Sequence, residues 1–392
     1  MKYKIKNLCK IVCGGTPSTS NPEYWGKDVI WLTPKDLSVN RSKYIDNSLN
    51  KLSVKGLNNS SAKIVPRGTV LLSSRAPIGY LAIANKKLCT NQGFKSLICN
   101  DKLINNEYLY YLLYTKVAEL QSISTGSTFL ELSTNTLKEY EINIHSMNEQ
   151  QHIVNILGSI DDKIENNEKI LKSLDKKLSM IHEKDLSKKL KTNNSYKLIR
   201  LSDVANFQSG YSYKGKDLTE TSKVALMTIK NFDRNVGFKI AGFKNLNPQN
   251  DSKQSQIVEL YDTVVAHTDL TQNAEIIGNA EMLLNKSKYE KIIASMDLVI
   301  VKPKNINKFL LYLYLHNKDF KDHALGYIAG TTVLHLNKKA LQEYKICFPV
   351  DNEKLIKLEN RIEVLILKQS SIIEINLKLN ELKQLYLKKF FG

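Results

Sequence analysis

Cysteine is scarce in this 392-residue sequence, which has five cysteines, an odd number. A disulfide framework needs pairs at regular spacings, so the count instead favours free thiols in a reducing, cytoplasmic environment. Long apolar runs are also absent. No stretch of about 18 uncharged apolar residues occurs, and we therefore expect no membrane-spanning helix. Residues 1–6 are basic, but no apolar segment follows them, which argues against a secretory signal.

Catalytic signatures are missing as well. The sequence contains no G-x-x-x-x-G-K-[ST] segment, which excludes a P-loop motor, and no Asn-Pro-Pro-aromatic segment of the amino-methyltransferase type. Cys9 and Cys13 have no His or Cys pair to complete a zinc site, so we expect no metal. We expect no catalytic residues. An enzyme with a cryptic nuclease or methyltransferase site is kept as the alternative.

Charge is the first positive signal. The chain has 57 Lys and Arg residues against 39 Asp and Glu residues, a formal net charge of +18. A strongly basic protein favours a polyanionic partner, nucleic acid before others. The richness in Lys, Asn and Ile can also come from an AT-rich genome, so the charge alone is only a hint.

The sequence repeats itself over a long period. Residues Gly126-Ser127-Thr128, Leu132, Leu137, Tyr140 and Asn148 recur 204 positions later as Gly330-Thr331-Thr332, Leu336, Leu341, Tyr344 and Asn352. The segment 31–37 also parallels 226–232. A period of about 200 residues indicates duplication of a whole domain with the segment that follows it, and not a solenoid. Gly126 and Gly330 are expected to adopt positive φ in matching turns.

Each copy begins with short apolar runs that are separated by Gly, Pro, Asn and Ser, which is typical of strands joined by turns. Residues 68–72, 80–84, 262–266 and 298–301 are such runs, and helical patches lie at 107–120 and 307–316. We therefore predict an α+β fold with two mixed α/β domains.

Each copy then ends in a long helix with a heptad pattern. The predicted seam of the first helix consists of Ile153, Leu157, Ile160, Ile164, Asn167, Leu171, Leu174 and Leu178, and that of the second includes Leu358, Ile362, Leu365 and Ile372. Gln369 and Asn376 also fall on the second seam, where polar residues commonly fix register. We predict that the two helices pair as an antiparallel coiled coil, which makes the repeat pseudo-two-fold. An intermolecular coiled coil is the alternative.

The predicted organisation has four segments. Residues 1–146 and 193–350 form the two domains, 147–192 form the central helix, and 351–392 form the C-terminal helix.

This plan resembles that of the specificity subunits of type I restriction–modification systems, in which target-recognition domains alternate with long helices. Gly14-Gly15-Thr16-Pro17 followed by Trp25 is similar to the family's opening. Residues 73–79 (Ser-Ser-Arg-Ala-Pro-Ile-Gly) and 91–95 (Asn-Gln-Gly-Phe-Lys) are similar to its central motifs. The second copy departs from them, with residues 267–273 (His-Thr-Asp-Leu-Thr-Gln-Asn) and 295–297 (Ser-Met-Asp) at those places. Two domains that bind different half-sites are expected to diverge in this way.

The resemblance implies a non-catalytic, sequence-specific subunit that binds double-stranded DNA at a bipartite, asymmetric site. It implies two methyltransferase subunits as partners, and restriction and translocase subunits in the larger complex, with methylation and restriction directed by this chain. S-adenosylmethionine, ATP and Mg²⁺ are then expected on those partners and no cofactor on this chain. A coiled-coil interaction protein that never binds DNA is a further alternative.

Candidate DNA-contacting residues lie in the loops that carry these motifs, because Arg pairs with guanine and Asn or Gln with adenine in the major groove. In the first domain they are Lys35, Arg67, Arg75, Gln92 and Lys95, and in the second Lys230, Asn231, His267, Thr268, Gln272 and Asn273. Candidates for phosphate contacts, where charge matters and not fork geometry, are Arg67 together with Arg41, Arg234, Lys239 and Lys244.

Overall fold

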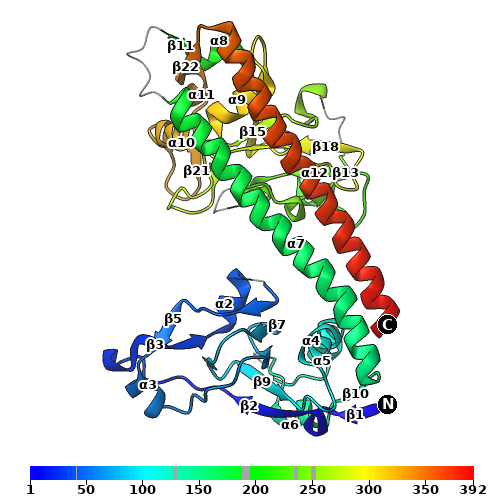
Figure 1. Ribbon diagram of the computed structural model, residues 1–392. Coiled ribbons are helices and arrows are strands. Elements are labelled where there is room, and N and C mark those ends of the chain that lie inside the picture. Colours follow the sequence, from blue (N-terminus) through cyan, green and yellow to red (C-terminus); the bar gives the residue numbers. More distant parts are fainter. Residues whose placement is uncertain (41, 127–129, 188–194, 234–236, 249–252) are drawn as a thin grey trace. The chain divides into compact units, whose positions relative to one another are not determined.

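A computed structural model describes residues 1–40, 42–126, 130–187, 195–233, 237–248 and 253–392 (Figure 1). Of the sequence-based predictions, those for Arg41, Ser127, Thr128, Arg234 and the helix end at 188–192 fall outside these residues. The chain forms two compact units, the first of residues 1–165 with 379–392 and the second of residues 166–378. Each unit therefore contains a segment of both long helices.

The first unit is built on a five-stranded sheet of order β2-β9-β6-β7-β4. Its strands are β2 (Cys9–Cys13), β9 (Phe94–Cys99), β6 (Val70–Ser74), β7 (Ile78–Ala84) and β4 (Tyr44–Ile45). A three-stranded sheet joins β5 (Asn50–Leu52), β3 (Trp25–Leu32) and β8 (Cys89–Thr90), and β1 (Lys2–Lys4) pairs with β10 (Glu141–Asn143). β3 and β8 run parallel. Buried apolar side chains of β6 and β9 belong to two core clusters, Val70, Leu72 and Leu97 to one and Leu71 and Phe94 to the other.

Short helices surround these sheets. They are α1 (Ile5–Leu8), η1 (Pro22–Tyr24), α2 (Pro34–Val39), α3 (Val54–Asn58), α4 (Asn106–Thr115), α5 (Val117–Ser122) and α6 (Thr134–Glu139). The Asn105 side chain caps α4 by accepting hydrogen bonds from the backbone N–H groups of Glu107 and Tyr108. α4 is buried along most of its length and packs on β6 and β7.

The second unit repeats this arrangement. Its four-stranded sheet has the order β12-β19-β15-β17, with β12 (Ala205–Ser209), β19 (Leu298–Pro303), β15 (Thr263–Ala266) and β17 (Ala280–Met282). A three-stranded sheet joins β14 (Lys244–Asn245), β13 (Val224–Met227) and β18 (Lys291–Ala294), and another joins β16 (Thr268–Asp269), β21 (Leu334–Leu336) and β20 (Ile328–Ala329). β11 (Tyr196–Arg200) pairs with β22 (Lys345–Pro349). The helices are α8 (Leu201–Val204), η4 (Gly215–Asp217), η5 (Ile229–Asn231), η6 (Ile240–Gly242), η7 (Gln254–Gln256), α9 (Lys308–Leu315), α10 (Lys318–Leu325) and α11 (Lys339–Glu343).

The repeat that the sequence predicts is thus a repeat of topology. The order β2-β9-β6-β7 corresponds to β12-β19-β15-β17, and the parallel pair β13–β18 corresponds to β3–β8. Asn307 caps α9 as Asn105 caps α4. Gly126 and Gly330 have φ values of +139° and +119°, which confirms the predicted positive φ at both turns. The predicted α+β class with two mixed domains is confirmed.

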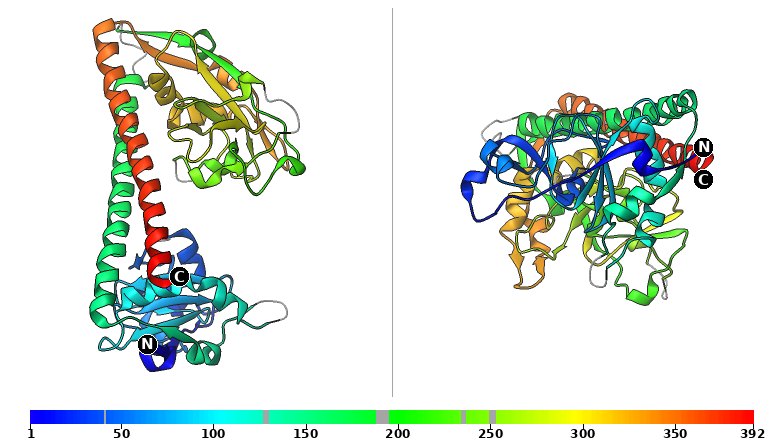
Figure 2. Two further views of the ribbon diagram at one scale, coloured as in Figure 1. Left: turned by 90° about the vertical axis from the view of Figure 1, so that its right-hand side faces the viewer. Right: turned by 90° about the horizontal axis from the view of Figure 1, so that it is seen from below.

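The long helices are α7 (Met147–Ile181), which continues into a π-helical turn at His182–Leu186, and α12 (Asn352–Phe391). In each unit their segments lie side by side (Figure 2) and run antiparallel. In the second unit Asn167 donates a hydrogen bond of 2.7 Å to Asn376, and Arg361 lies 3.9 Å from Asp185. Residues with increasing numbers along α7 therefore contact residues with decreasing numbers along α12. The antiparallel pairing within the chain is confirmed.

The predicted seam residues are all at least partly buried. Ile164, Leu171 and Leu365 are half-buried, and the others are buried, namely Ile153, Leu157, Ile160, Asn167, Leu174, Leu178, Leu358, Ile362 and Ile372. Residues at the ends of the seam also pack into the cores of the two domains. Ile153 and Leu157 of α7 belong with Leu387 of α12 to the core cluster of the first unit, and Leu178 of α7 and Ile362 of α12 belong to that of the second. Each domain therefore packs on both helices. None of the helices in the described residues is long and apolar enough to cross a membrane.

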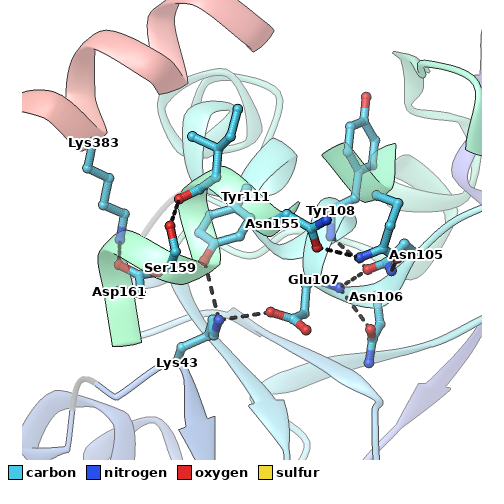
Figure 3. Close-up of polar contacts among 12 residues, drawn as sticks. Lys43, Asn105, Asn106, Glu107, Tyr108, Tyr111, Asn155, Ser159, Asp161 and Lys383 are labelled. Carbon is cyan, nitrogen blue, oxygen red and sulfur yellow. Dashed lines mark hydrogen bonds and ion pairs between the residues drawn. The ribbon is translucent and has the colours of Figure 1, made fainter. Parts of the chain in front are cut away.

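A polar network attaches the helices to the first domain (Figure 3). Asp161 of α7 accepts hydrogen bonds from the Tyr111 hydroxyl at 2.7 Å and from Lys383 of α12 at 2.6 Å. Lys43, in the segment before β4, donates to Glu107 of α4 at 2.8 Å and lies 3.4 Å from the Tyr111 hydroxyl. Burial and the charge of Asp161 raise the pKa of Tyr111, so the hydroxyl stays protonated and keeps donating.

In the second unit a buried histidine attaches the domain to α7. Nε2 of His316, at the end of α9, lies 3.0 Å from Asp175 of α7, and its Nδ1 lies 2.8 Å from the Ala280 carbonyl. Burial lowers the pKa of His316, but the hydrogen bond to Asp175 and the nearby Glu281 outweigh it and raise the value to about 9. Burial also raises the pKa of Glu281 to about 7.

We expect the contribution of His316 to stability to depend on pH. A histidine whose pKa rises on folding stabilises the protein fully below its unfolded pKa of 6.5, and this contribution is lost as pH rises through about 9. The variant Asp175→Asn should therefore be less stable than the parent at pH 6, and the difference should shrink toward pH 9. Urea unfolding at both pH values measures this, with Glu168→Gln, an exposed change on α7, as the control. A difference that is constant with pH would contradict the assignment.

Candidate nucleic-acid interface

In the first unit, four segments that carry the sequence motifs meet at one edge of the sheets. The N–H of Gly15 donates to the Thr90 carbonyl at 2.9 Å, and the N–H of Asn91 donates to that of Leu32 at 2.8 Å. The Ser74 N–H donates to the Gly93 carbonyl at 2.8 Å, and the Leu132 N–H donates to the Ser74 carbonyl at 2.9 Å. These main-chain bonds hold residues 14–16, 73–77, 90–95 and 131–132 together, with Leu32 of β3 as a further acceptor.

Glycine is required where the first of these segments approaches the next. A Cβ atom on Gly14 would lie 2.1 Å from the Thr90 carbonyl oxygen. Trp31 Nε1 donates to the Gly15 carbonyl at 2.9 Å, and the Thr16 hydroxyl donates to Gln92. Trp31 is buried and has a structural role here.

Three charged groups from different segments meet here, Arg75 from the loop after β6, Lys95 from β9 and Glu131 from the segment before α6. The Arg75 guanidinium lies 3.9 Å from Glu131, and the ammonium of Lys95 lies 3.4 Å from the same carboxylate. Arg75 is 38% exposed, whereas Lys95 is only 6% exposed. Ser73 shapes the loop, because its hydroxyl donates to the Pro77 carbonyl and accepts from the Tyr80 N–H, both at 2.7 Å.

The second unit has the same four main-chain bonds. The donors and acceptors are Tyr211 N to Ala294 O at 2.7 Å, Ser295 N to Met227 O at 2.8 Å, His267 N to Asp297 O at 2.7 Å and Leu336 N to His267 O at 2.9 Å. Gly210 corresponds to Gly14, since its Cβ atom would lie 1.9 Å from the Ser295 carbonyl oxygen. The two edges therefore share one backbone arrangement.

The side chains on this shared backbone differ. His267 stands in the place of Ser74, Met296 in that of Gln92, and Val299 in that of Lys95. Burial, with the charges of Lys338 and His335, lowers the pKa of His267, which favours the neutral imidazole at pH 7. Two edges that share a backbone arrangement but carry different side chains can bind the same kind of polymer at two different sequences.

Comparison with known protein families identifies the family of both domains. A model described as the type I restriction modification DNA specificity domain matches residues 1–176 and again 193–385. The chain belongs to this family of type I restriction–modification specificity subunits.

Named relatives and a solved structure agree with this. The specificity subunit of the type I restriction enzyme MjaIX of Methanocaldococcus jannaschii is 31% identical over 366 residues, which cover 88% of this chain and 82% of that protein. The HindI specificity subunit of Haemophilus influenzae is 33% identical over 141 residues, 35% of this chain and 30% of that protein. The crystal structure of the S subunit from M. genitalium has a TM-score of 0.59 at 17% identity, covers 100% of this chain and 96% of that one, and shows the same fold.

The structure sorts the residues that the sequence predicts to contact DNA. Seven are exposed or, for Arg75, nearly so, and they are Lys35, Arg67, Arg75, Gln92, Lys230, Gln272 and Asn273. Lys35 is the second residue of α2, and the start of α2 lies beside the loop of Gln92, since a Cβ atom on Gly93 would lie 3.2 Å from Pro34 Cγ. Arg67 precedes β6 and Arg75 follows it, so these two lie at opposite ends of one strand. His267 is half-buried.

Three of the predicted residues are buried, namely Lys95, Thr268 and Asn231. Thr268 donates its hydroxyl to Asp297 at 3.1 Å. Asn231 accepts from the Thr228 N–H at 2.9 Å and donates to the Lys239 carbonyl at 2.9 Å. In the first unit Asp36 makes the matching bond to the Thr33 N–H at 2.7 Å. Asn231 thus has a structural role in this turn, and its contact with DNA stays a prediction, as do those of the other candidates.

Sequence reasoning missed Glu131 and His335, which precede Leu132 and Leu336 of the repeat. The signal that could have found them is their fixed place, one residue before a repeated leucine. Among the described residues, no group of three or more His, Cys, Asp or Glu side chains could hold a metal ion.

Asn231→Ala should lower stability by about 1–3 kcal/mol, because it leaves a buried backbone N–H and a carbonyl without their partners. It should leave the bound DNA sequence unchanged. Thermal unfolding and DNA-binding titrations check the two expectations. The matched control is Lys230→Ala, whose exposed side chain should affect DNA affinity and not stability. A stable Asn231→Ala protein with altered sequence preference would instead support base contact.

Proposed function

We propose that this specificity subunit binds double-stranded DNA without catalysing a reaction itself. Each domain contacts one half of a bipartite, asymmetric site through the edge described above. The observation that carries this proposal is the set of four main-chain bonds repeated in both units with different side chains on them. Such an arrangement supports two domains that approach DNA alike and select different bases.

The proposed partners follow from this role. Two methyltransferase subunits bind the chain and modify the site, and restriction and translocase subunits join them in a larger complex. S-adenosylmethionine, ATP and Mg²⁺ are used by those partners. The net charge of +18 supports a partner with a phosphate backbone, and the affinity for DNA should fall steeply with salt.

Methylation mapping tests the proposal. The chain is co-expressed with the methyltransferase subunit from its own genome in a host without other adenine methylation, and modified bases are located by single-molecule sequencing. We expect one motif with two unlike half-sites separated by a fixed spacer. A single contiguous motif would contradict the bipartite site. Methylation or cleavage of DNA by the isolated chain, supplied with S-adenosylmethionine or Mg²⁺, would favour the alternative of an enzyme with a cryptic site.

We further infer that the length of the helix pair sets the spacer. One extra turn of four residues, inserted in α7 between Leu171 and Leu178 and in α12 between Ile366 and Ile373, lengthens each helix by about 6 Å. The spacer should grow by about two base pairs while both half-sites stay the same. The same mapping measures it. An insertion in α7 alone is the control, because it puts the seam out of register and should lower stability. An unchanged spacer in an active double insertion would refute this inference.

A further inference from the structure

Glu131 and His335 occupy the same position in the two units. Glu131 precedes Leu132, whose N–H bonds to the Ser74 carbonyl, and His335 precedes Leu336, whose N–H bonds to the His267 carbonyl. The backbone of Glu131 also pairs with Thr125, as that of His335 pairs with Ala329. The correspondence therefore rests on hydrogen bonds on both sides of the residue and not on sequence alone.

In the first unit this position holds a carboxylate between two cations. Glu131 is 42% exposed and lies 3.4 Å from the buried Lys95 and 3.9 Å from Arg75. At 3.9 Å the carboxylate attracts one side of the guanidinium without a hydrogen bond, so the N–H groups of the guanidinium stay free to donate. An Arg fork held in this way can pair with O6 and N7 of guanine.

In the second unit the same position holds an imidazole and lacks both cations. Thr268 replaces Arg75 and is buried, with its hydroxyl on Asp297, and the apolar Val299 replaces Lys95. His335 itself is exposed. The charged groups near His267 are Lys338, His335 and Asp297. The Asp297 carboxylate is already bonded to Thr268 and to Ser295. His335 is thus an exposed polar side chain at this position.

We propose that this position determines specificity in both domains. This inference rests on the proposed function. In the first domain Glu131 is a positioning residue that orients Arg75 for a guanine of one half-site. In the second domain His335 contacts a base of the other half-site directly, through a ring nitrogen. Exchange of one residue type at one backbone position thereby changes how the two halves are selected.

Methylation mapping of variants tests this, with the full chain and its methyltransferase partner. Arg75→Lys keeps the charge but removes the fork, and Glu131→Ala removes the carboxylate. Both should lower the preference for guanine at one position of one half-site by about 10-fold. His335→Ala should relax one position of the other half-site to a similar degree. Glu131→Gln, which keeps the size and a hydrogen-bonding oxygen, should retain more of the preference than Glu131→Ala.

The unaltered half-site in each variant serves as an internal control for folding. A variant that misfolds loses methylation of both half-sites. If Glu131→Ala misfolds, Glu131→Gln is used in its place, and a DNA-binding titration at low salt measures the sequence preference. Lys339→Ala, an exposed change four residues from His335, should change no base preference. If the parent methylates no bipartite motif, the proposed function fails. If it does, and Arg75→Lys and His335→Ala leave both half-sites unchanged, this inference alone is overturned.

Discussion

The antiparallel contact of α7 with α12 completes the core of each unit. In the first unit Leu157 of α7 and Leu387 of α12 belong to the same cluster as the aromatic face of α4. In the second, Leu178 of α7 and Ile362 of α12 join the cluster around α9. Burying one such side chain contributes about 1.5–3 kcal/mol. Loss of either helix would therefore expose apolar surface in both domains, so helix pairing and domain folding depend on each other.

Apolar burial gives this contact its strength, and buried polar groups restrict its register. A heptad seam of Leu and Ile can slip by one repeat at little cost, because similar side chains meet again. The hydrogen bond from Asn167 to Asn376 and the pair of Asp161 with Lys383 do not survive such a slip, so the buried Asn167 and the partly buried Asp161 and Lys383 would each lose a contact. The bond between Asp175 and His316 fixes one domain along α7 in the same way.

Much of this architecture follows from periodicity, and less of the interface does. The heptad spacing predicts the seam from Ile153 to Leu178, and the 204-residue offset predicts the matching turns at Gly126 and Gly330. Both are local properties of the chain. Whether a side chain faces solvent depends on contacts between distant segments, which a single sequence does not display. Asn231 fits the pattern of a base-contacting amide, yet it is bonded to the backbone of its own turn. Glu131 lies next to a repeated leucine but is not itself repeated, and it approaches Arg75 only through the fold.

The same distinction explains how two domains can diverge in what they contact without losing their fold. The four bonds that assemble each edge join backbone atoms, so they set no requirement on most of the side chains they position. The exception is Gly14 with its counterpart Gly210, where any Cβ atom would collide with a carbonyl oxygen. Glu131 and His335 can differ because the bonds beside them join main-chain atoms, whereas the buried Thr268 also bonds to Asp297 through its hydroxyl. A surface of this kind can change its ligand by single substitutions while the stability, which resides in the shared backbone and the helix-completed core, is kept.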